Sequence, residues 1–183
     1  MRASYINGNG RGSLLDYPGQ MEPRPPSQSV SVMTLWMGPT EANAAGNVHG
    51  GTIMRMCDEV AGIAAIRHSR CRVVTAGVDR TTFLHPVYVG NLVTVRACVN
   101  AAWRTSMEVG VRVESEDIRS RETRHTSTAY LTMVALDEDG RPTEVAPLAP
   151  ETPEELRRQR EAQLRRDNRL AEREHIVVGR REH

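Results

Sequence analysis

The sequence predicts an α+β domain in which an antiparallel sheet of five to six strands is wrapped around one long central helix. One stretch, starting after residue 49, repeats apolar residues with the 3.6-residue period of a helix, whereas the segments on either side alternate with period two. Aromatic residues make up 4% of the 183 residues, so Val, Ala, Met and Leu must fill the core, which suits strands. The order of one strand, the helix and four strands favours a single curled sheet.

Residues 1–28 are rich in Gly, Pro, Ser and Asn and have no apolar period, so we expect a disordered N-terminal arm. The pair Leu14-Leu15 is far short of a signal-peptide core, and no later run approaches the roughly 18 apolar residues of a membrane span. The net charge of +1 gives no overall attraction to nucleic acid or to an anionic membrane. We therefore expect a soluble, cytoplasmic protein with neither as a partner.

Residues 29–37 form the first predicted strand, which ends at a Gly-Pro turn. A loop over 40–49 follows, in which Asn43 and Asn47 are both able to cap or precede the helix. The helix extends to about residue 70, where Arg67 and His68 complement the negative end of its dipole. Its predicted buried stripe consists of Ile53, Cys57, Val60, Ala61 and Ala64, continued by Ile63 and Ile66.

Four further strands are predicted over 73–84, 92–102, 107–114 and 124–136, and the middle two form a hairpin around residues 103–105. The domain thus covers residues 29–150. Residues 151–183 are densely charged and predict a helical tail. This tail either contacts a partner or a nucleotide, or is a solvated surface helix, which is the commoner case for such a charge run.

The predicted helix begins with a glycine pair, Gly50 and Gly51, and carries Asp58 seven residues after Gly51. Glycine lets a ligand approach the backbone closely, and amide N–H groups at the positive end of a helix suit an anion. Asp58 is the one helix carboxylate that lies against apolar neighbours, and the positions four and seven before it and three, four and seven after it carry no cationic residue. It is a candidate general base, or else a structural carboxylate satisfied by backbone donors.

The composition excludes several kinds of chemistry. All 24 basic residues are Arg, so mechanisms based on a lysine Schiff base or a lysine base are excluded. The three cysteines are odd in number and have no Cys-x-x-Cys spacing, which favours reduced thiols over zinc or redox sites. We expect no bound metal.

Three segments carry a resemblance to a known family: residues 47–53, residues 56–62 with Arg67-His68, and residues 73–86. Together they resemble the hotdog-fold acyl-CoA thioesterases, in the branch of the cytosolic, or brain, long-chain acyl-CoA hydrolase and its bacterial single-domain relatives. The resemblance covers about residues 30–145 and implies hydrolysis of fatty acyl-CoA to free fatty acid and CoA. It implies no cofactor, because CoA is part of the substrate.

The resemblance also implies roles for four residues. Asp58 would activate water as a general base or attack the thioester directly, and the sequence does not separate these two routes. The amides of Gly50 and Gly51 would stabilise the oxyanion. Asn47 would orient the water or hold the thioester carbonyl, although an isolated Asn at this position is more often a helix cap.

Four more residues are candidates for binding the substrate. Arg104, Thr105 and Ser106, at the predicted hairpin tip, would meet the CoA phosphates, although an unliganded surface Arg is common at such a tip. His49 would also lie near the substrate. A rival interpretation pairs His49 with Glu59 or Asp58, as in hotdog dehydratases, but a lone His at a helix start is more often structural.

In the two-domain relatives, the Asn and the Asp belong to different hotdog domains, whereas this chain carries both. The resemblance therefore implies a homodimer with composite sites, each built from Asn47 of one subunit and Asp58 of the other. The similar bacterial enzymes imply that such dimers assemble into a hexamer as a trimer of dimers. The alternative function is a non-catalytic acyl-CoA-binding or sensing protein on the same fold.

Overall fold

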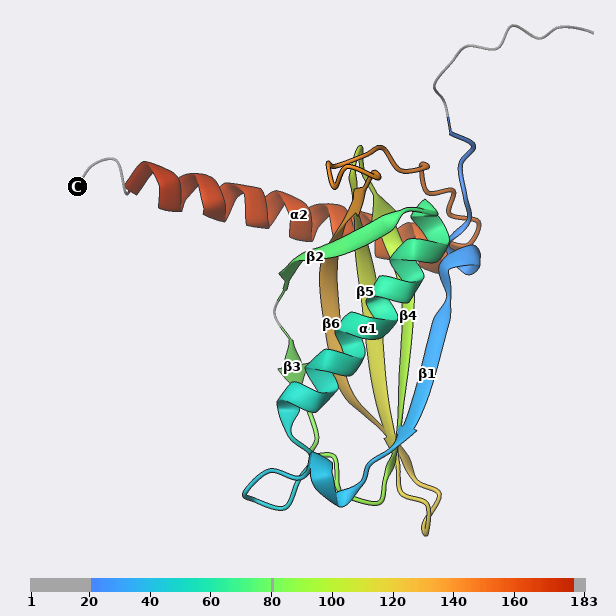
Figure 1. Cartoon of the computed structure of the whole chain (residues 1–183), viewed down its shortest axis with the longest axis vertical. Helices are drawn as coiled ribbons and strands as arrows, with labels where there is room; N and C mark the ends of the chain where they lie inside the picture. The colour runs from blue at the N-terminus through green and yellow to red at the C-terminus, as the bar shows by residue number, and fades with distance from the viewer. Residues whose placement is uncertain (1–20, 80, 180–183) are drawn as a thin grey trace, which may run out of the picture.

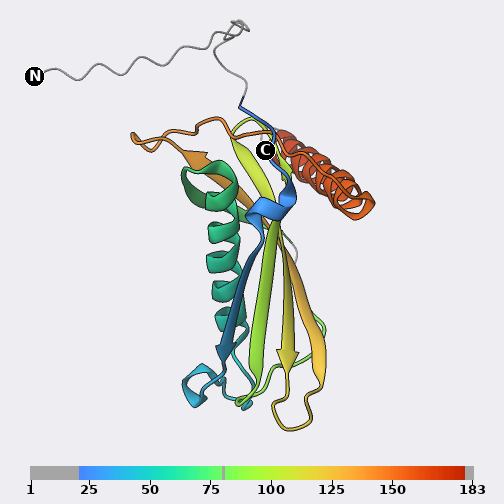
Figure 2. The same ribbon diagram turned by 90° about the vertical axis from the view of Figure 1, so that its right-hand side faces the viewer.

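The computed structural model describes residues 21–79 and 81–179. In chain order its elements are η1 (Pro26–Ser29), β1 (Ser31–Trp36), η2 (Pro39–Glu41), α1 (Gly50–Ser69), β2 (Arg72–Val78), β3 (Thr82–Phe83), β4 (Leu92–Ala102), β5 (Ser106–Glu116), β6 (Thr123–Leu136) and α2 (Pro153–Gly179). The strands form one antiparallel sheet in the order β1-β4-β5-β6-β2, and β3 pairs with β6. The sheet curls around α1, while α2 crosses its opposite face (Figures 1 and 2). The predicted fold class is confirmed.

The core lies between α1 and the concave face of the sheet. Every second residue of β4, β5 and β6 points towards α1 and is buried, as the period-two patterns predict. The helix packs closely because its buried face carries small side chains between larger ones. The helix residues of this core are Ile53, Met56, Cys57, Val60, Ala61, Ala64 and Ala65.

Two helix residues differ from the prediction. Ile63 and Ile66, expected to continue the buried stripe, are 44% and 48% exposed. Met54 is exposed as well. The helix is therefore apolar on more of its circumference than the sheet of one chain covers.

The strand predicted over residues 73–84 is two strands, β2 and β3. The pairing of β2 with β6 shifts between Thr75 and Gly77, so one additional residue is accommodated there as a bulge. After β2, the amide of Asp79 donates to the carbonyl of Tyr130 at 2.8 Å, and β3 then pairs further along β6. Thr75 thus lies on an edge strand, directly before the bulge.

Part of the disordered arm predicted over residues 1–28 is ordered. Residues 21–28 belong to the domain: the Arg24 amide donates to Pro147 O at 2.9 Å, and Arg24 O accepts from Ala149 N at 2.8 Å. The Arg24 guanidinium also donates to the carbonyl of His68 at the end of α1. The remainder of that prediction, residues 1–20, lies outside the described residues.

The charged C-terminal helix is present, and one of its faces contacts the sheet. It begins with a capping box, because the Thr152 hydroxyl accepts from Glu155 N while the Glu155 carboxylate accepts from Thr152 N. Arg165 and Arg169 then contact Glu108 of β5, so this helix is not wholly solvated. Across residues 21–79 and 81–179, neither helix combines the length and apolar content needed to cross a bilayer.

Candidate active site

The loop before α1 is shaped by the side chain of Asn43. The side-chain Oδ1 accepts hydrogen bonds from the backbone amides of Ala45 at 2.9 Å and Asn47 at 3.2 Å. The backbone amide of Asn43 donates a hydrogen bond to Asn47 O at 2.7 Å. Gly46 completes the tight turn with a φ of 80°, which glycine adopts without strain. Asn43 and Asn47 are both half-buried. The two asparagines therefore lie side by side ahead of the helix.

His49 is the residue that caps α1, in place of the two asparagines considered from sequence. Its Nδ1 accepts from the Gly51 amide at 2.9 Å, so in this arrangement Nδ1 carries no proton. A Cβ at Gly51 would lie 3.1 Å from that nitrogen, which explains why glycine is favoured here. The structural interpretation of His49 is thus the one that the geometry supports.

The two glycine amides predicted to stabilise an oxyanion differ in their surroundings. The Gly51 amide is occupied by His49. Among the residues that the structure describes, none accepts a backbone hydrogen bond from the Gly50 amide, and the Phe83 ring lies beside this glycine, 3.5 Å from the position of a Cβ. At the positive end of a 20-residue helix, Gly50 is therefore the better placed donor for a developing negative charge.

Asp58 lies two turns further along α1, on the side of the helix that the sheet does not cover. Its Oδ1 accepts a hydrogen bond from the Thr75 hydroxyl at 2.5 Å, a short bond typical of an ionised acceptor. Thr75 comes from edge strand β2, and its hydroxyl also lies 3.4 Å from the sulfur of Met133. The bond fixes one carboxylate oxygen and leaves the other available for chemistry.

Cys57, directly before Asp58, is a poor nucleophile. Burial and, to a smaller extent, the negative charge of Asp58 together raise the pKa of its thiol to about 11. The thiol is therefore protonated at neutral pH, and the thiolate is the reactive form of cysteine. Asp58 is the stronger candidate for the reacting group on this helix.

The rival pairing of His49 with an acidic residue is not formed. Asp58 and Glu59 lie about 12 Å or more along the helix from its first residue, at ~1.5 Å per residue. Glu59 instead pairs with Arg55 at 2.9 Å. The same separation keeps Asn47 and Asp58 of one chain apart.

An exposed apolar surface borders Asp58. It runs from α1 over edge strand β2 and past β3, and its side chains are between 44% and 52% exposed. Exposed apolar side chains on neighbouring elements are typical of an interaction site. We call this set the α1–β2 surface; it consists of Met54, Ile63, Ile66, Val78, Phe83 and Leu84.

The hairpin tip predicted to bind CoA lies at the other end of the sheet from the start of α1 (Figure 1). The carbonyls of Arg104 and Thr105 accept from Val145 N and Ala135 N, both at 3.0 Å. The Ser106 hydroxyl accepts from Arg166 at 3.4 Å. A single chain therefore does not bring these three residues to Asn47 and Gly50.

Within residues 21–79 and 81–179, no three His, Cys, Asp or Glu side chains come together as a metal-binding group.

The chain matches the family model described as the thioesterase superfamily over residues 45–122. It is 41% identical over 138 residues to Protein VdlD of Helicobacter pylori, a match that covers 75% of this chain and 79% of that protein. It is 35% identical to the cytosolic acyl coenzyme A thioester hydrolase of Rattus norvegicus over 75% of this chain, but spans only 36% of that longer protein.

Solved structures of acyl-CoA thioesterases have the same fold as this chain. An apo-hexameric acyl-CoA thioesterase superposes with a TM-score of 0.80 at 35% identity, over 83% of this chain and 97% of that chain. An acyl-CoA hydrolase from Staphylococcus aureus, solved with butyryl coenzyme A, coenzyme A and coenzyme A disulfide, has a TM-score of 0.78 at 32% identity, over 85% of this chain and 94% of that chain.

Three variants of the staphylococcal enzyme have been solved, with an asparagine, an aspartate and a threonine each replaced by alanine. Asn43, Asp58 and Thr75 of this chain have the same residue types at the same sequence intervals. Sequence reasoning named Asn47 and Asp58 and assigned no catalytic role to Asn43 or Thr75. The matching intervals and the hydrogen bonds of Asn43 to the loop and of Thr75 to Asp58 add these two residues to the candidates.

Three findings support one family: the matching family model, the match over 79% of Protein VdlD, and the superposition over 97% of the apo-hexameric thioesterase. This chain belongs to the thioesterase superfamily, has its hotdog fold, and is a thioester hydrolase.

Proposed function

We propose that this protein hydrolyses acyl-CoA, releasing a free fatty acid and CoA, with Asp58 as the central catalytic residue. The observation that carries the proposal is the 2.5 Å hydrogen bond from Thr75 to Asp58, on the uncovered side of the helix. The names and bound ligands of the relatives support acyl-CoA as the substrate. The name of the rat relative also supports a cytoplasmic location.

In the proposed reaction, Asp58 removes a proton from water as the water oxygen attacks the thioester carbonyl. Direct attack by the carboxylate is the second route, with water then hydrolysing the acyl-enzyme. In both routes the carbonyl π bond opens to an oxyanion, which the Gly50 amide at the start of α1 would stabilise, joined by Gly51 if His49 turns away. The oxyanion then collapses, the carbon–sulfur bond breaks, and the CoA thiolate takes up a proton.

We propose that each site is shared between two subunits. Asn47 and the helix start of one chain are too distant from its own Asp58 to hold one thioester with it. The α1–β2 surface beside Asp58 would bury its apolar side chains against the same surface of a second copy, in a closed two-fold dimer. That arrangement would bring Asn47, and Asn43 beside it, from one subunit to Asp58 of the other.

A trimer of such dimers is the assembly that we expect in solution. The solved structure of an apo-hexameric acyl-CoA thioesterase, which is similar to this chain, supports a hexamer here. In that assembly, His49, Arg104, Thr105 and Ser106 remain candidates for contacting CoA, since a neighbouring subunit can approach a site that their own chain does not reach.

Thiol release from acyl-CoA tests the proposal. Purified protein is incubated with acyl-CoA of several chain lengths and a thiol reagent, and Asp58→Asn is compared with Glu59→Gln. Both variants lose one carboxylate from the same helix, but Glu59 is on the exposed face and pairs with Arg55. We expect Asp58→Asn to abolish turnover and Glu59→Gln to retain it. Bound CoA without thiol release in the wild type would instead indicate a sensing protein.

A further inference from the structure

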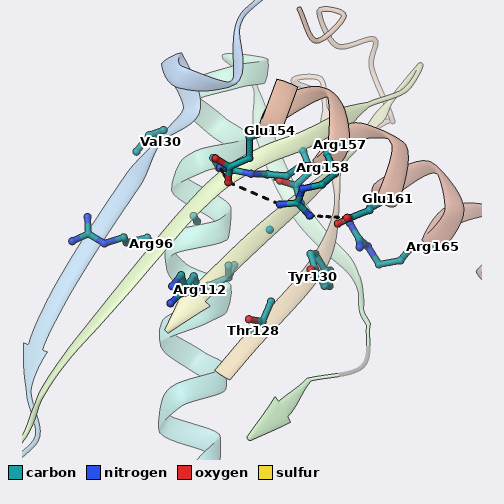
Figure 3. A pocket seen from close by; sticks show the side chains of 15 residues that line it. Val30, Arg96, Arg112, Thr128, Tyr130, Glu154, Arg157, Arg158, Glu161 and Arg165 are labelled. Carbon is teal, nitrogen blue, oxygen red and sulfur yellow. Dashed lines mark hydrogen bonds and ion pairs between the residues drawn. The ribbon is translucent and has the colours of Figure 1, made fainter. Parts of the chain in front are cut away.

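A cavity of about 410 Å³ lies on the outer face of the sheet, beneath the first turns of α2 (Figure 3). Helix α1, which carries Asp58, is on the opposite face (Figure 2). The cavity therefore belongs to neither the proposed thioester site nor the α1–β2 surface. Its size is within the range of roughly 300–1,000 Å³ that is typical of small-molecule sites.

Five arginines from three elements line this cavity, which we call the α2 pocket: Arg96 of β4, Arg112 of β5, and Arg157, Arg158 and Arg165 of α2. Guanidinium groups match phosphate and carboxylate oxygens in pairs, which makes such a cluster suited to a multiply charged anion. The floor supplies neutral polar groups from Asn100 and Thr128. Val30, Ala97 and Cys98 add apolar surface for an organic body.

The two arginines from the sheet share a single carboxylate partner, so their positive charge is only partly neutralised. Arg96 and Arg112 are directly opposite one another on neighbouring strands, a placement that is unfavourable for like charges. They share one carboxylate, Glu114, at 3.8 and 2.9 Å. Both side chains are more than half exposed, so they are accessible to a ligand.

The arginines from the helix are held by weak pairs that a ligand can replace. Arg157 pairs with Glu161 and Arg158 with Glu154, each at 2.6 Å and four residues apart on the same helix, and both carboxylates also line the pocket. Exposed pairs of this type are only weakly stabilising. A phosphate group offers stronger bidentate acceptors.

Arg165 has a different role, because it forms a fixed wall of the pocket. Its guanidinium binds Glu108 at 2.7 Å and lies 3.6 Å from the centre of the Tyr130 ring. Gly110 keeps the adjoining floor free of side chains, since a Cβ there would lie 2.4 Å from Asn100 Nδ2. One wall is thus rigid, while the charged groups opposite can rearrange.

We propose that the α2 pocket binds a small phosphorylated molecule carrying at least two negative charges, at a site separate from the thioester site. Arg112 and Arg157 face the cavity from the sheet and the helix and supply phosphate donors. Arg96 contributes at the rim, and Arg158 lines the same helix wall (Figure 3). Binding draws α2 and the outer face of the sheet together.

Calorimetric titration of the full chain with ADP, and separately with inorganic pyrophosphate, tests the proposal. The double variant Arg112→Gln/Arg157→Gln removes one donor from each wall. The matched control is Arg124→Gln, whose arginine is similarly exposed and paired with Glu122 but does not line the pocket. We expect ADP affinity to fall at least about tenfold in the double variant, and to be unchanged in the control, because hydrogen bonds to charged groups are lost.

The titration needs no substrate, so its result is independent of the proposed reaction. Pyrophosphate binding with the same sensitivity would assign the interaction to the phosphates, whereas binding of ADP alone would assign part of it to the organic body. Absence of binding by both probes at millimolar concentration would overturn the proposal. So would equal losses in the double variant and the control, or ADP inhibition that is purely competitive with acyl-CoA.

Discussion

The ion pair between α2 and the sheet predicts unequal effects when its two members are removed. The Glu108 side chain has no exposed surface, whereas that of Arg165 is 23% exposed. Arg165 donates to the carboxylate at 2.7 Å from Nη2 and 3.1 Å from Nε, and Asn100 donates at 3.3 Å. The carboxylate is therefore confined, while the guanidinium has a route to water.

In Arg165→Met, the buried carboxylate of Glu108 keeps only the hydrogen bond from Asn100 and the Arg169 guanidinium at 3.8 Å as partners. We expect a loss of about 3 kcal/mol in the free energy of unfolding, at the lower end for a broken buried pair. Glu108→Gln keeps a hydrogen-bonding group of the same size, and the freed Arg165 can turn towards water, so we expect about 1 kcal/mol. For a chain of this length, these values correspond to drops of about 6–12 °C and 2–4 °C in Tm.

Urea and thermal unfolding followed by far-ultraviolet circular dichroism measure both losses. Arg173→Met is the control, since Arg173 is an exposed residue further along the same helix. The double variant Glu108→Leu/Arg165→Met removes both charges and should be more stable than Arg165→Met alone. Equal losses for the two single variants, or an Arg165→Met protein as stable as the control, would refute this reasoning.

Three further predictions follow from individual contacts. Thr75→Val should lower kcat about tenfold because Asp58 loses a charge-assisted hydrogen bond, whereas Thr75→Ser should retain most activity. Equal thiol-release rates for the two variants would contradict this role of the Thr75 hydroxyl. Burial lowers the pKa of His68 below 6.5, so the unfolded chain binds a proton that the folded chain does not. Stability should therefore fall as pH drops through about 6.5, and this slope should disappear from Tm measurements on His68→Gln; an unchanged slope would contradict it. Arg24→Ala should reduce stability by about 1.5 kcal/mol in urea unfolding through loss of the bond to His68 O, and an unchanged free energy of unfolding would contradict this contribution.

The sequence predicted the parts of the fold whose burial is decided within one chain. The strands β4, β5 and β6 alternate over most of their length, and their inward residues are buried as expected, with local register shifts at Val99/Ala101 and Val113/Glu114. The start of α1 at Gly50 followed from the glycine pair and the change of period. Here local pattern and tertiary packing favour the same structure.

The differences have two physical causes. Ile63 and Ile66 fit the apolar period, but periodicity does not distinguish an apolar face that the sheet buries from one that it leaves exposed. The bulge after Thr75 and the packing of Arg24 on residues 147–149 depend on contacts between segments distant in sequence. Thr75 itself, a hydroxyl on a strand, gives no sequence signal until its bond with Asp58 is seen.

The sharing of each active site between two subunits is tested most directly by mixing inactive variants. Asn47→Ala and Asp58→Asn should each be nearly inactive alone, and Asn43→Ala with Asp58→Asn provides the same test for the second asparagine. After co-refolding, random pairing makes about half of the dimers mixed, each with one intact site of two, so roughly a quarter of wild-type thiol release should return. Preparations verified to contain mixed dimers, yet no more active than the separate variants, would show that the residues do not act across the interface.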